Sequence, residues 1–120
     1  MFKYYNANPN GEHIGDCVIR AISTATGIRY EDVLKYLYIT SNYFNCDMLV
    51  KECYSKFLKK YTKAKYIVDE DITVGELAER YKDKKLIMRV PNHLTCSRYG
   101  TVYDIWDCTN ELVDTFWIVE

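Results

Sequence analysis

Cys17 lies in the stretch GDCVIR, after a loop rich in Asn and Gly and at the start of a helical pattern. Unpaired backbone N–H groups and the positive end of the helix dipole stabilise a thiolate in the first turn of a helix. The thiolate is the form of cysteine that attacks a carbonyl carbon. Asp16, the expected N-cap, opposes a second anion unless its charge is used in capping. Cys17 is therefore a candidate nucleophile, and a buried structural thiol is the alternative.

A nucleophilic cysteine also needs a base, and the chain contains only two histidines, His13 and His93. His93 opens the stretch HLTCS, which is expected to be a strand, so its side chain should stand at the end of the sheet, where it can face a helix terminus. His13 lies in the Gly- and Asn-rich loop, which should hold a side chain less firmly. We therefore expect His93 to be the base and keep His13 as the alternative.

Asp104 is the expected third member of the site. It lies eleven residues after His93 in the stretch YDIWD, on the strand predicted to follow HLTCS. If these strands pair through the turn RYG, Asp104 comes close to His93 and can orient its ring. Trp106 shares a strand face with Asp104 and should shield their hydrogen bond, whereas Asp107 points the other way and should cap the turn DCTN.

Four helices are expected before these strands. Apolar spacing predicts a helix from residue 17 to a stop at Gly27, and a second over residues 30–39. A third, capped by Asn45 and running to about Tyr61, would bury Leu49, Cys53 and Phe57. The T-x-x-E capping box of Thr73 and Glu76 predicts a fourth helix.

From residue 86 the pattern changes to alternating strands, KLIMRV, HLTCS, TVYDIWD and DTFWIV. A helical part followed by strands predicts an α+β fold, with N-terminal helices packed on a C-terminal antiparallel sheet. The length of 120 residues suits one domain over residues 1–120.

These motifs resemble the papain-like cysteine peptidases, in the broad sense that includes their small C39-like members. The resemblance lies in a Cys at the start of the first long helix, GDCVIRAIS, a His beginning a strand, NHLTC, and an Asp on the next strand with Trp two residues on, YDIWD. It implies a papain-like fold in which Cys17 is the nucleophile, His93 the general base and acid, and Asp104 the orienting residue.

One feature of that family is missing, because papain-like enzymes usually carry a Gln shortly before the Cys to bind the oxyanion. This chain contains no Gln. Asn8 is the expected substitute, since Pro9 restricts its backbone, and the backbone N–H of Cys17 would be the second donor. The alternative is that Asn8, like its neighbours Asn6 and Asn10, only forms turns.

The composition limits which binding partners and which cellular location can be expected. The net charge is -1, with no long run of one sign, and no stretch resembles a membrane span or a secretion signal. We expect no nucleic-acid or membrane partner. Five cysteines without a CxxC pair favour reduced thiols and a cytoplasmic location. Abundant Tyr, Lys, Asn and Ile suggest an AT-rich bacterial or phage genome.

We therefore expect a hydrolase that cleaves a peptide or isopeptide amide bond through a Cys17–His93–Asp104 triad and a thioester, without metal or cofactor. Its partner would be a peptide or protein substrate. A zinc site of His93, Cys96 and Cys108 is a weaker alternative, since only His93 and Cys96 have ligand spacing. The alternative function is a non-catalytic papain-like binding module, for example a phage-encoded inhibitor of a host protein.

Overall fold

The computed structural model describes all residues of the chain, 1–120, as one α+β fold. A six-stranded sheet has the order β1-β5-β4-β3-β6-β2. The chain contains four helices, α1 (Cys17–Thr26), α2 (Tyr30–Phe44), α3 (Lys51–Leu58) and α4 (Val74–Arg80). The strands are β1 (Phe2–Tyr4), β2 (Thr62–Ile67), β3 (Lys85–Val90), β4 (His93–Arg98), β5 (Thr101–Asp104) and β6 (Thr115–Val119).

The α+β class is confirmed, but the prediction of a purely C-terminal antiparallel sheet is wrong. β1, from the N-terminus, pairs parallel to β5, which makes the sheet mixed. β2, which lies between α3 and α4 in sequence, pairs antiparallel to β6 at the opposite edge. Both are edge strands with mostly exposed residues, so neither shows the apolar alternation of a half-buried strand.

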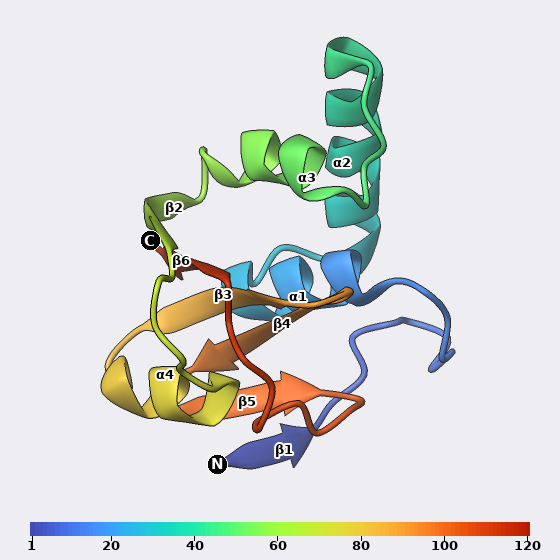
Figure 1. The fold of residues 1–120 in the computed structure, drawn as a ribbon. Helices are drawn as coiled ribbons and strands as arrows, with labels where there is room; N and C mark the ends of the chain where they lie inside the picture. The colour runs from blue at the N-terminus through green and yellow to red at the C-terminus, as the bar shows by residue number, and fades with distance from the viewer.

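The sheet separates two apolar cores. One lies against α1, α2 and α3, and the other lies against α4 and the segment before β6. Central strand β3 supplies both, because Ile87 joins the first core while Leu86 and Met88 join the second. Figure 1 shows α1 against the sheet, α2 and α3 beyond it, and α4 at the far end of the molecule. The packing of α1 on this face of the sheet thus sets where the helix begins relative to the ends of the strands.

Two helix predictions hold and one is wrong. Gly27 ends α1 in the left-handed conformation, and Thr73 and Glu76 form the predicted capping box of α4. Asn45, however, is the C-cap of α2 with φ 52°, so α2 extends to Phe44 and α3 begins only at Lys51. An Asn that tolerates a left-handed backbone suits a helix end as well as a helix start.

The cysteines also differ from expectation. Cys46 and Cys53 form a disulfide, seven residues apart in sequence, between the end of α2 and α3. The prediction that all five cysteines are reduced is therefore wrong in this structure. Cys17, Cys96 and Cys108 are free.

The turn between β4 and β5 is as predicted. Tyr99 and Gly100 both have positive φ, at 53° and 88°, which suits the tight turn of a hairpin. Arg98 pairs with Thr101 across it, so the start of β4 lies beside the end of β5. None of the four helices has both the length and the apolar character needed to cross a membrane.

Candidate active site

The predicted triad residues lie on three elements that meet at one end of the sheet. Cys17 is the first residue of α1, His93 is the first residue of β4, and Asp104 is the last residue of β5. β4 and β5 are antiparallel, so the start of one and the end of the other lie at the same sheet end. The packing of α1 on β4 brings the start of the helix there as well.

His93 and Asp104 form a short hydrogen bond, with 2.6 Å between Nε2 and Oδ2. The Asp104 side chain is almost fully buried, and the His93 side chain is 12% exposed. Trp106 packs edge-on against the imidazole, with ring centroids 5.0 Å apart, so the predicted contact is present. The predicted strand position is wrong, because β5 ends at Asp104 and Trp106 lies in the bend that follows, 45% exposed. The bond to Nε2 leaves Nδ1 as the ring nitrogen that can exchange a proton with a thiol.

Burial opposes charge on both partners, but their interaction outweighs it. Burial disfavours the imidazolium and by itself would lower the pKa of His93. The pKa nevertheless lies well above its ordinary value, because His93 is hydrogen-bonded to the charged Asp104 and contacts the thiols of Cys108 and Cys17. Burial likewise disfavours the carboxylate, yet His93 lowers the pKa of Asp104 to about 2. The pair is thus held as imidazolium and carboxylate near neutral pH.

Cys17 is half-buried beside this pair. Burial raises the pKa of a thiol, but the His93 side chain, the backbone N–H of Leu94 and the charge of Arg20 together lower the pKa of Cys17. The Asp16 side chain makes no capping bond to α1, so the first backbone N–H groups of the helix have no side-chain acceptor. These N–H groups can stabilise negative charge on the thiol or on an oxygen bound beside it.

Arg20 connects the start of α1 to the triad, and it was not predicted. Its Nη1 donates to Asp104 Oδ1 at 3.0 Å, and its Nε donates to Asp16 Oδ1 at 2.7 Å. The side chain is only 7% exposed. The sequence does contain a signal that could have revealed this ion pair, because Arg20 is a charged residue among the apolar residues of α1 and lies four positions after Asp16.

Asp16 and Asn8 take different roles from those expected. Asp16 accepts hydrogen bonds from Arg20, from Asn8 Nδ2 at 3.0 Å and from the Tyr30 hydroxyl at 2.8 Å. Burial alone would raise the pKa of Asp16, but these donors lower it. Asn8 is buried and uses its amide N–H on Asp16, and it does not line the cleft beside Cys17. The predicted oxyanion role of Asn8 therefore has no geometric support.

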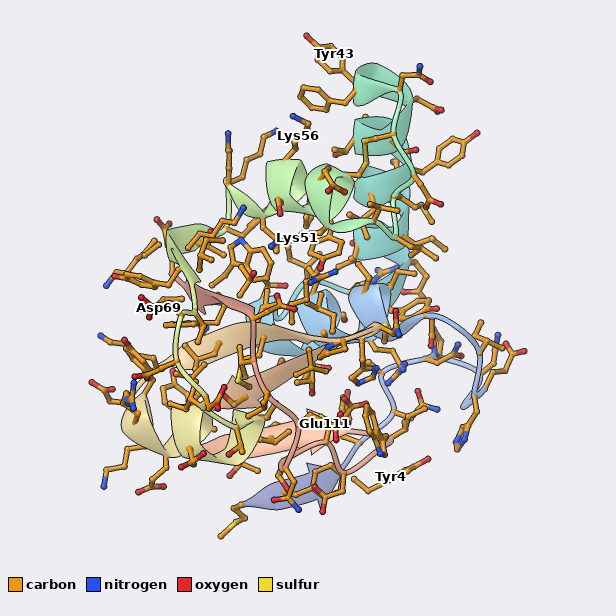
Figure 2. All side chains as sticks on the ribbon, viewed as in Figure 1. Tyr4, Tyr43, Lys51, Lys56, Asp69 and Glu111 are labelled. Atoms are coloured by element: carbon orange, nitrogen blue, oxygen red, sulfur yellow. A yellow bond between two sulfur atoms is a disulfide. The ribbon has the colours of Figure 1, made fainter.

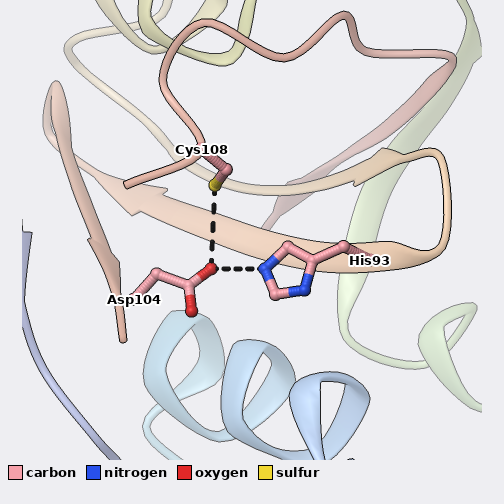
Figure 3. A group of neighbouring side chains, drawn as sticks. All are labelled: His93, Asp104 and Cys108. Atoms are coloured by element: carbon pink, nitrogen blue, oxygen red, sulfur yellow. Dashed lines mark hydrogen bonds and ion pairs between the residues drawn. The ribbon is translucent and has the colours of Figure 1, made fainter. Parts of the chain in front are cut away.

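Cys108 is a second thiol at the site. Its Sγ donates to Asp104 Oδ2 at 3.7 Å, from the segment that follows β5 (Figure 3). Ligand atoms of His93, Asp104 and Cys108 all lie within 4.8 Å of one another, so these three could hold a metal ion. The guanidinium of Arg20 on the same carboxylate opposes a second cation there. Charge thus favours a hydrogen-bonded network over a metal centre.

The alternatives named from the sequence lie elsewhere. His13 is hydrogen-bonded to the exposed Tyr4 hydroxyl at 2.9 Å and does not line the cleft. Asp107 accepts from Thr109 in the following turn, as predicted. Cys96 belongs to the core beneath α1 and Cys108 to the core on the other face of the sheet. The zinc set of His93, Cys96 and Cys108 is therefore not brought together.

An open cleft of about 390 Å³ gives access to Cys17 and His93. Leu49 and Val50, before α3, and Asn92, before β4, contribute to its walls. Leu49 was predicted to be buried in a helix, but it is 42% exposed and faces this cleft region. The side chain of Asn92 is the amide that lines the cleft. The sequence did not predict this, because Asn92 lies in a turn. A substrate segment can thus reach the thiol from the side of α3.

No family model, curated protein or solved structure matches this chain.

Proposed function

We propose that the protein is a cysteine-dependent amide hydrolase of papain-like type, acting on a peptide or isopeptide bond. The observation that carries this proposal is the 2.6 Å bond between His93 and a buried Asp104, next to a thiol of lowered pKa at the start of a helix. This is the arrangement that nucleophilic catalysis requires, with a nucleophile, a base and a group that orients the base.

In the proposed reaction the Cys17 thiolate attacks the carbonyl carbon of the substrate amide. Backbone N–H groups at the start of α1 stabilise the oxyanion, and the His93 imidazolium gives its proton to the leaving amine. The products of this step are a thioester on Cys17 and a free amine. His93 then takes a proton from the water that attacks the thioester, and the products are the acid, the Cys17 thiolate and the His93 imidazolium of the starting state.

The ionisation of the site sets the expected pH dependence. Activity should rise as pH rises through the lowered pKa of Cys17, because the thiolate forms there. It should fall as pH rises through the raised pKa of His93, because the proton for the leaving amine is then lost.

A non-catalytic papain-like binding module is the second candidate. One observation favours it: the amide of Asn8 is bonded to Asp16, so no side chain before Cys17 replaces the missing Gln as an oxyanion donor. Loss of one such donor costs about 10²–10³ in rate. The backbone N–H groups alone would then have to stabilise the oxyanion.

Acylation by p-nitrophenyl acetate separates the two candidates without knowledge of the natural substrate. A hydrolase should release a burst of about one equivalent of p-nitrophenol and then turn over, with a transient acetyl group on Cys17. Cys17→Ala should abolish the burst. A wild-type protein that is acylated no faster than free cysteine, or that never deacylates, would instead indicate a binding module.

A further inference from the structure

Three hollows form a continuous surface that leads away from Cys17. The cleft shares Lys51 and Glu52 with a second hollow over α3, which we call the basic hollow. The basic hollow shares Lys56 with a third and larger one of about 620 Å³ between α2 and α3, which we call the aromatic groove. A ligand lying along these hollows would extend from the triad to the far end of α2.

This surface has a positive charge that the whole chain lacks. Residues 51–65 contain six lysines and one acidic residue, Glu52, in a chain of net charge -1. No lysine in this segment takes part in an ion pair. Five of the six line the three hollows, namely Lys51, Lys56, Lys59, Lys60 and Lys65. The local charge is thus free to attract an anionic ligand.

The far end of the surface is apolar and exposed. Ile39, Tyr43 and Phe44 line the aromatic groove and are 52%, 81% and 47% exposed. The ammonium group of Lys56 lies 4.7 Å from the centre of the Phe44 ring, so a cation and an aromatic face stand side by side. Figure 2 shows Lys51 and Lys56 on α3 and Tyr43 at the end of α2. A ligand for this groove needs both acidic and apolar groups.

We propose that the three hollows together bind an acidic polypeptide segment with apolar side chains, which docks beside the scissile bond of the substrate. The inference rests on the proposed function, because the surface leads to a thiol that attacks acyl carbons. A polypeptide supplies both the acyl carbon and the acidic and apolar side chains. Nucleic acid supplies negative charge and stacking bases but has no amide in its backbone.

Fluorescence anisotropy tests this proposal with Cys17→Ser protein, which cannot cleave the probe. The probe is a fluorescein-labelled peptide of Glu, Asp, Leu and Phe, and the comparison probes are the same peptide with Lys for each acidic residue and a labelled oligothymidylate. Lys56→Glu combined with Lys60→Glu should weaken binding of the acidic peptide about tenfold, because each reversal replaces an attraction by a repulsion. The basic peptide and the oligothymidylate should bind more weakly than the acidic peptide.

A matched control is Lys3→Glu combined with Lys82→Glu, which changes net charge equally on β1 and just after α4, far from α3 (Figure 1). This control should alter affinity less than about twofold. Equal losses in both double variants, or tighter binding of the oligothymidylate, would overturn the proposal. Acylation of Cys17 by p-nitrophenyl acetate should be unchanged in both double variants, so a failed docking surface and a failed hydrolase give different results.

Discussion

Asp104 is held by two cationic groups, Arg20 on one carboxylate oxygen and the His93 ring on the other. The Ile105 backbone N–H and the Cys108 thiol donate to it as well. Because these donors hold both oxygens, the Asp104 carboxylate does not easily rotate or become protonated. It therefore fixes the ring plane of His93. Asp104 therefore acts on the site through His93, because it holds the imidazole ring in place and its charge stabilises the imidazolium.

Asp104→Asn tests that role, with Asp107→Asn as its matched control. Loss of the Asp104 charge should lower the pKa of His93 and remove imidazolium from beside the thiol. Iodoacetamide labelling of Cys17 at neutral pH should then slow by about tenfold or more, while Asp107→Asn, which changes only an exposed turn, should leave the rate within about twofold. A slower rate only in the Asp107 variant would show that the wrong carboxylate has been assigned.

The triad positions could be predicted from the sequence because each lies next to a strong local signal. Cys17 starts a helix with a clear apolar stripe, and His93 and Asp104 flank a hairpin marked by Gly100. Arg20 and Asn92 were missed, and Cys108 was named only as a zinc ligand, because their roles depend on contacts between distant elements. Arg20 and Asp104, for example, are 84 residues apart in sequence.

At the scale of elements, Arg20 joins α1 to β5 through Asp16 and Asp104. Arg20→Met keeps much of the side-chain volume but leaves two buried carboxylates without their cation. We expect a loss of about 3–5 kcal/mol in the free energy of unfolding, measured by urea denaturation. Arg29→Met, at a side chain that is 76% exposed, should change it by less than about 0.5 kcal/mol. If the free energy of unfolding of Arg20→Met equals that of the wild type, the ion pairs of Arg20 do not hold α1 and β5 together.

Element boundaries show why some predictions failed. Asn45 is the predicted N-cap of the third helix, yet this residue is the C-cap of α2, since Asn favours both kinds of helix end. β1 and β2 pair at the sheet edges and bury few side chains, so their sequences contain little periodicity. Edge strands are fixed by tertiary pairing, which a local pattern does not reveal.

At the scale of the whole molecule, the disulfide between Cys46 and Cys53 ties the loop before α3 to α3 itself. This segment forms one wall of the cleft through Leu49, Val50 and Lys51. The bond therefore restrains the wall of the cleft that the proposed substrate would contact. Its absence should loosen that wall and destabilise the folded protein.

Reduction should lower the free energy of unfolding by about 2 kcal/mol, the chain-entropy value for a short closed loop. The measurement is guanidinium denaturation with and without a phosphine reductant. The control is Cys46→Ala combined with Cys53→Ala, which should show no response to the reductant. The same small response in wild-type and double-variant protein would show that the bond does not stabilise the fold.

The central claim is that His93 activates Cys17. Site-resolved mass spectrometry of iodoacetamide labelling across pH tests it most directly. The Cys17 labelling profile should have its midpoint below the ordinary pKa of cysteine, and His93→Ala should move that midpoint upward, because burial then dominates the pKa of the thiol. A Cys17 midpoint at or above that of an ordinary thiol, or one that does not move in His93→Ala, would contradict the account.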